Sequence, residues 1–298
     1  MEAEPELQLN LGERSYRYYR NAVERHWDPH EIEIEEDRKN LLEADLDEDV
    51  FEGMRMGIAR FGAGEEAVTE DLAPFSVVLE DIEDQMYVTT QIYEEAKHTE
   101  LFDRYWRNVI NPVEEANGWE KSSPLEDRWF NDAYDELFER NERATSRLLE
   151  EDTPENRARA FSHYHLTIEG IAAQTGYYGM GRSYSEDEFP ELPHLPGLVE
   201  GLDHTRADEG RHVGFGMSKL KELVQEEGVD PRIIDETVAE LVPLVQGIVG
   251  DDEYQEDRGV PSEELTAYAA EKHTERMGHI KDAAREMPGV DELVAIDD

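Results

Sequence analysis

Two four-residue segments of the chain place a carboxylate and an imidazole at the spacing of metal ligands. They are Glu95-Ala-Lys-His98 and Glu209-Gly-Arg-His212. Positions i and i+3 share one face of a helix, so each segment would direct both donors toward one point. A chain this rich in glutamate gives one or two such segments by chance, on a solvated helix face. Apolar residues flank both segments, however, and this favours a buried metal site.

Two further glutamates complete the set that a dinuclear carboxylate bundle needs. Such a bundle takes one carboxylate from each of two helices and a Glu-x-x-His pair from each of two others. Glu65 and Glu169 are the candidates. Glu65 lies 30 residues before Glu95, and Glu169 lies 40 residues before Glu209. Facing positions on an antiparallel helix pair should be about 30–40 residues apart, so both pairs fit.

The predicted ligand set points to iron or manganese. Four glutamates and two histidines offer mainly hard oxygen donors, which suit these metals better than zinc. The chain has no cysteine, which excludes thiolate-zinc sites, iron–sulfur clusters and disulfides. The sequence therefore predicts a dinuclear iron or manganese site.

Helical periodicity dominates the chain, and strand signals are few. The expected helices are 13–26, 46–60, 64–83, 84–110, 124–149, 154–179, 197–227, 231–249 and 261–286. Glu95 and Glu169 are 74 residues apart, and the helix at 124–149 would fill this gap without supplying a ligand. Asn111-Pro112 predicts a break, Pro74 a kink in the 64–83 helix, and 183–196 a loop.

No linker rich in proline, glycine or serine divides the chain. We therefore expect a single all-α domain over residues 1–298. The metal-binding bundle core should occupy about 46–227, and the helices at 231–286 should follow it.

Four segments, in the right order, resemble the ribonucleotide reductase small subunit superfamily. They are GEEAVTEDLAPF (64–75), YEEAKHTELF (93–102), YHLTIEG (164–170) and DEGRHVGFG (208–216). The nearest branch is that of the ligand-binding oxidases with a heterodinuclear manganese–iron site, which RYYRNAVERHWDPHEIEI (17–34) also resembles. The resemblance covers most of residues 14–220. It implies a ferritin-like fold, in which additional helices surround a four-helix bundle core, and a homodimer.

The resemblance also implies a chemistry. One manganese and one iron ion, or alternatively two iron ions, would activate O2 for two-electron oxidation of a long-chain fatty acid or similar apolar ligand. In this branch a valine and a tyrosine become joined by an ether bond, and the matching positions here are Val68 and Tyr164. On a regular helix Tyr164 would lie about 140° from Glu169, so we expect it to flank the metals and face the neighbouring helix.

The same resemblance assigns two residues around the ligands. A metal-bound histidine commonly donates its second N–H to a carboxylate, and Asp208 matches the residue that does this for His98. Trp27 matches a tryptophan that bonds to that aspartate and carries electrons. The remaining histidines are expected at surface or capping positions: His163, His165, His194, His204, His273 and His279.

Two alternative functions stay open. One is a ribonucleotide reductase small subunit of the manganese–iron type, working with a large partner subunit. Phe102 stands where radical-forming subunits carry a tyrosine, and the end GVDELVAIDD lacks the tyrosine of their docking tail. Manganese–iron reductases also lack the radical tyrosine, so Phe102 alone does not decide. The other alternative, ferritin-like metal storage, fits poorly with the 74-residue spacing.

The charge balance excludes other classes of partner. Asp and Glu total 74 against 29 Lys and Arg, a formal charge of −45 that repels nucleic acid. No stretch approaches the roughly 18 apolar residues of a membrane span, and the start has no signal-peptide pattern. Aromatic residues spread along the chain argue for a folded core rather than disorder. We expect a cytoplasmic protein of a high-salt-adapted organism.

The acidic surface predicts a salt-dependent stability. The thermal unfolding midpoint should be higher in molar KCl than in dilute buffer. The physical reason is that the Debye length falls from about 10 Å at 0.1 M to about 3 Å at 1 M, which screens the self-repulsion. Calorimetry across this salt range checks the prediction, and equal midpoints would contradict it.

Overall fold

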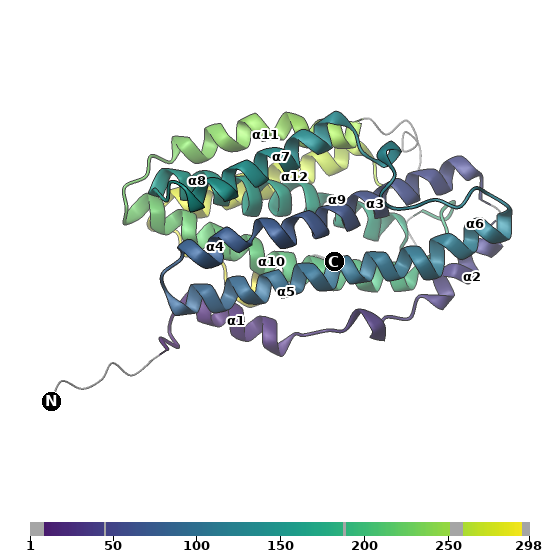
Figure 1. Cartoon of the computed structure of the whole chain (residues 1–298), viewed down its shortest axis with the longest axis horizontal. Helices are drawn as coiled ribbons and strands as arrows, with labels where there is room; N and C mark the ends of the chain where they lie inside the picture. Colours follow the sequence, from purple (N-terminus) through teal and green to yellow (C-terminus); the bar gives the residue numbers. More distant parts are fainter. Residues whose placement is uncertain (1–8, 45, 187–188, 251–258, 294–298) are drawn as a thin grey trace.

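The computed structural model describes residues 9–44, 46–186, 189–250 and 259–293, and within these ranges every regular element is helical. Figure 1 shows long helices running side by side along the molecule. The central bundle consists of α3 (Glu48–Asp71), α5 (Ile82–Tyr105), α10 (Pro196–Gln225) and a composite helix built from α8 (Pro154–Phe161), η5 (Ser162–Ala173) and α9 (Gln174–Ser183). The predicted all-α bundle is confirmed.

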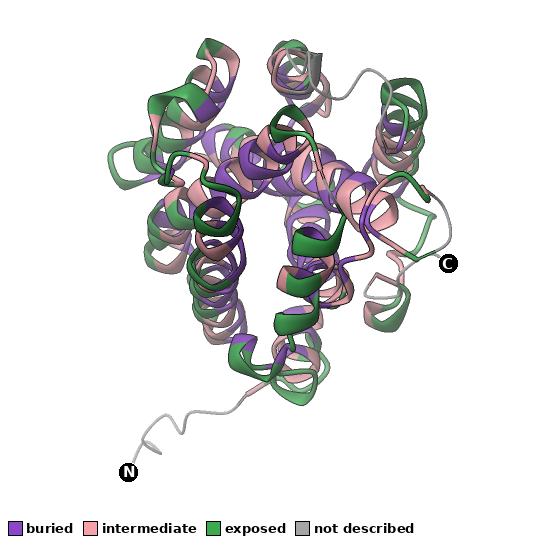
Figure 2. Cartoon of the chain, turned by 90° about the vertical axis from the view of Figure 1, so that its right-hand side faces the viewer, coloured by how far each residue is buried: buried purple, intermediate pink, exposed green. Residues whose placement is uncertain are grey.

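Additional helices cover the bundle on two sides (Figure 1). On one side, α1 (Arg14–Glu24) packs on α5, and α2 (Glu35–Glu43) lies near the far end of the bundle. On the other side lie α7 (Asp132–Ser146), α11 (Arg232–Gly250) and α12 (Ser262–Lys281). In Figure 2 the buried residues of the bundle helices are turned inward. Among the described residues, none of the helices combines the length and apolar character that a bilayer span requires.

Proline positions differ from the sequence expectation at two places. Pro74 does not kink a long helix: α3 ends at Asp71, and Pro74 sits in the first turn of the short α4 (Ala73–Val78). The break expected at Asn111-Pro112 is wrong, because the π-helical η2 (Trp106–Ile110) leads directly into α6 (Asn111–Asn117). Pro112 occupies the first turn of α6, where its missing N–H removes no bond within that helix.

Helix η5 is a π-helix over twelve residues, Ser162–Ala173, within the composite helix. Its backbone bonds join residues five apart, and Thr167 Oγ1 also donates to the carbonyl of Ser162 at 2.8 Å. Residues at i and i+5 therefore approach the same face, which a regular α-helix would not allow. Most π-helices are single turns and many occur at functional sites.

A glycine allows α10 to approach η5 closely. A Cβ atom at Gly216 would collide with the side chain of His165. Glycine at this position therefore lets the two helices pack closely. The helices α2 and α13 (Val290–Leu293) were not expected from the sequence, since each is too short to show a helical period.

The N-terminus of α10 is capped by a residue far away in sequence. Helix α10 starts at Pro196 without a capping side chain from Leu195. Instead, the buried carboxylate of Asp37 on α2 accepts from the backbone N–H groups of Gly197 at 2.8 Å and Leu198 at 2.7 Å. Tyr105 Oη donates to the same carboxylate at 3.0 Å. One side chain thus fixes α2 and α5 against the start of a helix that carries metal-site candidates.

Replacing this cap should weaken the fold. We expect Asp37→Ala to lower the free energy of unfolding by about 2 kcal/mol, because it leaves buried N–H groups without an acceptor. Asp28→Ala is the control, since Asp28 caps only the exposed N–H of His30 and should cost under about 0.5 kcal/mol. Urea unfolding in molar KCl measures both. Equal losses in the two variants would contradict the role of Asp37.

Candidate metal centre

The structure brings the predicted ligands together in two sets. Within each set, one donor atom per residue lies within 4.8 Å of every other. The first set is Glu65, Glu95, His98 and Glu209, and the second is Glu95, Glu169, Glu209 and His212. No member is more than 5 % exposed. Glu95 and Glu209 belong to both sets, the arrangement expected of carboxylates between two ions.

Each helix of the central bundle contributes to the cluster. Glu65 comes from α3 and Glu169 from η5, while α5 and α10 each supply a Glu-x-x-His pair. On both helices the i,i+3 spacing brings the carboxylate and the imidazole of the pair close together, as expected. Nδ1 of His98 lies 3.3 Å from Glu95 Oε2, and Nδ1 of His212 lies 3.4 Å from Glu209 Oε2.

The cluster lies between two apolar clusters of the bundle. On α5, Tyr87 and Val88 belong to one of them and Leu101 to the other, with the Glu-x-x-His pair between. On α10 the order is reversed, with Leu202 in the second apolar cluster and Val213 in the first. The carboxylates are therefore enclosed by apolar side chains at both ends of the bundle.

Burial sets the protonation of these carboxylates. It raises the pKa of Glu169 to about 8, and the Glu209 carboxylate adds to the shift. It likewise raises the pKa of Glu65 and of Glu209. Burial also acts to raise the pKa of Glu95, but the two imidazoles outweigh it and hold that pKa well below its usual range. Without a further cation, the cluster cannot keep all four carboxylates ionised.

Unpaired atoms in the cluster fit bound metal ions. The Oε2 atoms of Glu95, Glu169 and Glu209 and the Nδ1 atom of His212 are buried and have no hydrogen-bond partner among the described residues. Buried carboxylate oxygens are normally hydrogen-bonded, paired or bound to a metal. Four carboxylates with two imidazoles fit manganese or iron by donor type.

The outer nitrogen of His98 is held by the aspartate that the sequence indicated. His98 Nε2 lies 3.1 Å from Asp208 Oδ2, and Trp27 Nε1 donates to the same oxygen at 2.8 Å. Trp27 is buried just beyond the end of α1, and its ring lies parallel to those of His98 and His204. Lys97 Nζ lies 2.9 Å from Asp208 Oδ2 and 4.4 Å from the centre of the Trp27 ring.

Glu94 holds the outer nitrogen of His212, as Asp208 holds that of His98. This role of Glu94 was not predicted from the sequence. His212 Nε2 lies 2.9 Å from Glu94 Oε2. Arg211 donates to both Asp208 and Glu94, which links the two outer carboxylates. The signal was in the sequence: Glu94-Glu-Ala-Lys-His and Asp208-Glu-Gly-Arg-His share one pattern, and the first acid of each holds the histidine of the other.

Tyr164 lies closer to the cluster than expected. Its Oη donates to Glu95 Oε1 at 2.8 Å, while Gln91 Nε2 donates to Glu169 Oε1 at 2.9 Å. The expectation that Tyr164 turns 140° away from Glu169 is wrong, because η5 is a π-helix in which i and i+5 share a face. Val68 lies on α3 one turn after Glu65 and lines the same cavity as Tyr164.

Two further buried residues were not indicated as site residues by the sequence. Tyr177 on α9 donates its hydroxyl hydrogen to Glu65 Oε1. His165 was expected at a surface or capping position, and this is wrong: it is fully buried, with Nε2 3.4 Å from Gln91 Oε1. Burial lowers its pKa well below the usual value, which favours the neutral imidazole.

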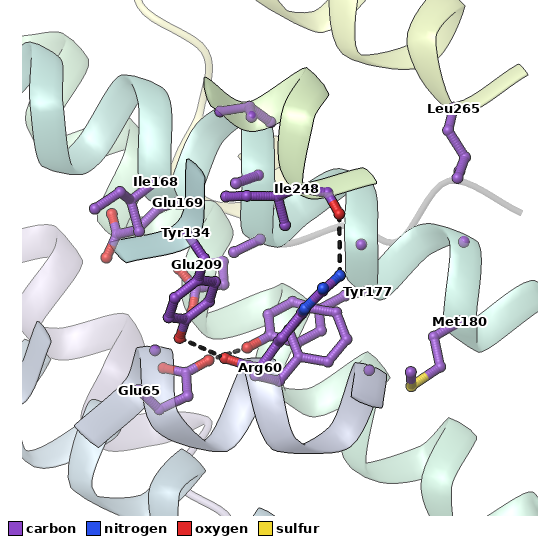
Figure 3. Close-up of a pocket in the computed structure, with 18 of the residues that line it drawn as sticks. Arg60, Glu65, Tyr134, Ile168, Glu169, Tyr177, Met180, Glu209, Ile248 and Leu265 are labelled. Carbon is purple, nitrogen blue, oxygen red and sulfur yellow. Dashed lines mark hydrogen bonds between the residues drawn. The ribbon is translucent and has the colours of Figure 1, made fainter. Parts of the chain in front are cut away.

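An apolar cavity of about 210 Å³ opens from the carboxylates. Figure 3 shows Glu169 and Glu209 at one end and Met180 and Leu265 at the other. Arg60 also lines the cavity and donates to the carbonyls of Trp129 and Ile248. The arrangement can hold two metal ions beside a space suited to an elongated apolar molecule.

Comparison with known proteins gives one family and a consistent set of structures. The sequence profile described as "Ribonucleotide reductase, small chain" matches residues 13–270. The resemblance read from the four sequence segments is thereby confirmed.

Three similar solved structures are R2-like ligand-binding oxidases. One with an aerobically reconstituted Mn/Fe cofactor is 27 % identical, with a TM-score of 0.79 over 92 % of this chain and 94 % of its own. A variant with an aerobically reconstituted Fe/Fe cofactor is 27 % identical, with a TM-score of 0.80 over 92 % and 95 %. A variant with an anaerobically reconstituted Mn/Fe cofactor is 29 % identical, with a TM-score of 0.78 over 92 % and 95 %.

Removal of a shared carboxylate should empty the centre. We expect Glu209→Ala to lose nearly all bound manganese and iron after reconstitution, because Glu209 belongs to both sets. Glu66→Ala is the control, since Glu66 is exposed beside Glu65 and should leave metal content unchanged. Elemental analysis by plasma mass spectrometry measures both. Full metal occupancy in Glu209→Ala would rule out the ligand assignment.

Proposed function

The chain belongs to the ribonucleotide reductase small chain family, and from this we propose that it is a ligand-binding oxidase. In this proposal it uses a manganese–iron centre to activate O2 for the two-electron oxidation of an apolar, fatty-acid-like ligand. The observation that carries the proposal is the apolar cavity that ends on the metal-site carboxylates. The cofactors named for the similar oxidases support it.

The proposed ligands divide between two ions. Glu65 and His98 would bind one ion, Glu169 and His212 the other, and Glu95 and Glu209 both. When bound in reduced form, manganese and iron would bind O2 and supply two of the four electrons that convert it to water. We propose Mn/Fe rather than Fe/Fe because two of the three similar structures described above carry an Mn/Fe cofactor and one carries Fe/Fe.

The protein supplies orientation around this centre. Asp208 and Glu94 hold the outer nitrogens of the two histidines, so each imidazole presents Nδ1 to the cluster. The apolar clusters on either side exclude water, which strengthens electrostatic interactions in the site. A fatty acid could place its chain along the cavity toward Met180 and Leu265 (Figure 3).

We include a cross-link between Val68 and Tyr164 in the proposal. Forming the ether joins Cβ of Val68 to Oη of Tyr164 and removes one hydrogen from each, as two protons and two electrons in total. O2 is the oxidant that takes up these electrons. Oη of Tyr164 donates to Glu95 Oε1 at 2.8 Å, so Glu95 is positioned to receive the phenolic proton. Val68 and Tyr164 are both buried and line the same cavity.

The residue Phe102 argues against a reductase subunit that carries a tyrosyl radical at this position. Phe102 is buried and packs against the rings of Phe61 and Tyr177. A phenylalanine has no O–H to oxidise, so this position cannot form a tyrosyl radical. A reductase of the manganese–iron type is the competing function that the next experiment separates.

Aerobic reconstitution with manganese and iron should form the cross-link. We expect the intact mass to fall by two hydrogens, and the peptides that contain Val68 and Tyr164 to stay joined after proteolysis. Tyr164→Phe should bind metal but give separate peptides. Tyr87→Phe is the matched control, because Tyr87 is equally buried with an unpartnered hydroxyl, and this variant should still cross-link.

Two separate, unmodified peptides from the wild-type protein would contradict the cross-link. If the same protein then supported ribonucleotide reduction with a large subunit, the reductase function would replace the oxidase. Anaerobic reconstitution serves as the oxidant control, since without O2 no ether should form.

A further inference from the structure

A second cavity of about 550 Å³ lies on the other side of the metal-site helices. Its inner wall includes Gly210 and Val213 of α10, and its outer wall comes from α12 and the residues that follow it. No residue lines both this cavity and the one that opens from the carboxylates. The second cavity is therefore separate from the proposed oxidation site.

Cationic side chains line this cavity in a chain that is otherwise strongly acidic. The chain has 74 acidic residues against 29 Lys and Arg. The cations around the cavity are Arg206, Lys272, Arg276 and Arg285. The other titratable groups around it are Glu275, Glu286, Glu292, His279 and Tyr268. The three glutamates are exposed, whereas all of the cations except Arg285 are half-buried, so the interior is positive and the rim carries the carboxylates.

Arg276 is a half-buried cation without a counter-ion. Its guanidinium donates to the backbone carbonyl of Gly170, and no described carboxylate lies within 4 Å of it. Burial lowers its pKa from 12.5 to about 10, because neighbouring Tyr268 and Glu275 offset the loss of water only in part. The side chain stays protonated at neutral pH. A buried charge that is compensated only in part is costly, and an anion in the cavity would relieve the cost.

Two stacked tyrosines hold two of the other cations. The rings of Tyr178 and Tyr268 lie 4.2 Å apart and 2° from parallel. The Arg206 guanidinium lies 5.7 Å from the Tyr178 ring, and Lys272 Nζ lies 5.7 Å from the Tyr268 ring. Nε of Arg206 is buried without a hydrogen-bond partner, and Nη1 of Arg206 lies 3.8 Å from Asp203 Oδ1. The aromatic faces thus fix positive charge here, and Nε of Arg206 is left as an unused donor.

We propose that this cavity binds a small organic phosphate. The phosphate group would lie between Arg206 and Arg276, since guanidinium groups bind phosphate oxygens through paired N–H donors. Val213 and Met217 would contact the organic part. The volume falls within the roughly 300–1,000 Å³ that is typical of small-molecule sites. A dianionic phosphate fits this cavity better than a single carboxylate because two guanidinium groups, those of Arg206 and Arg276, line it.

Calorimetric titration of the full chain with AMP tests the proposal, with inorganic phosphate as the second probe and KCl held constant. We expect AMP to bind, and Arg276→Gln to weaken its affinity by about tenfold or more. Arg206→Gln should weaken it similarly, which guards against a folding defect in one variant. Arg107→Gln removes the same charge at an exposed site paired with Asp103, and should leave the affinity unchanged.

Several results would overturn the proposal. These are the absence of AMP binding to the wild type, or equal affinities in Arg276→Gln, Arg206→Gln and Arg107→Gln. Equal affinities for AMP and inorganic phosphate would contradict the claim that the cavity contacts the organic part of the ligand. The titration is repeated with Glu209→Ala, and loss of binding there would place the phosphate on the metal ions instead. An unchanged affinity in Glu209→Ala supports a site independent of the proposed oxidase function.

Discussion

Four glutamate side chains buried against one another repel unless cations lie between them. Removing a carboxylate from water is costly, and burial raises the pKa of Glu65, Glu169 and Glu209. Two imidazoles compensate part of this, chiefly at Glu95. The rest of the bundle serves to keep these charges together, because each of its helices contributes to the cluster and apolar residues close it at both ends. Two metal ions provide the missing positive charge in our account.

Around the cluster, buried cations are paired with buried carboxylates. Arg211 lies between Asp208 and Glu94, and each of these carboxylates holds one histidine by its outer nitrogen. Lys97 adds a second cation beside Asp208. Both cations come from within the Glu-x-x-His segments themselves. Each segment thus supplies metal-site donors and a balancing cation, and the acid directly before it orients the histidine of the other segment.

Much of the candidate site could be predicted from the sequence because helix geometry ties spacing to direction. The distances of 30 and 40 residues between glutamates fit Glu65 and Glu169 as ligands, and the cluster contains both. Glu94 was within reach, since its place in the first segment equals that of Asp208 in the second. Tyr177 was not, because a lone tyrosine more than a hundred residues from Glu65 gives no signal of their contact.

The π-helix explains the main geometric errors. A sequence is interpreted with 3.6 residues per turn, and η5 departs from this over twelve residues, which brings Tyr164 to the cluster. The same departure at η2 allows the helix to continue past Pro112. The close approach of His165 in η5 to Gly216 on α10 is a tertiary contact that local sequence periodicity does not reveal. The short α2 was not expected because it shows no helical period, and the capping of α10 by its Asp37 depends on a contact between segments far apart in the sequence.

The central claim is that these six residues bind two different metal ions. Anomalous diffraction at the manganese and iron absorption edges, on crystals reconstituted with both metals, tests it most directly. We predict two peaks about 3.5–4 Å apart within the cluster, with manganese and iron each dominating one position. Glu95 and Glu209 should contact both. A cluster without an anomalous peak at either edge, or with metal only elsewhere on the acidic surface, would contradict the account.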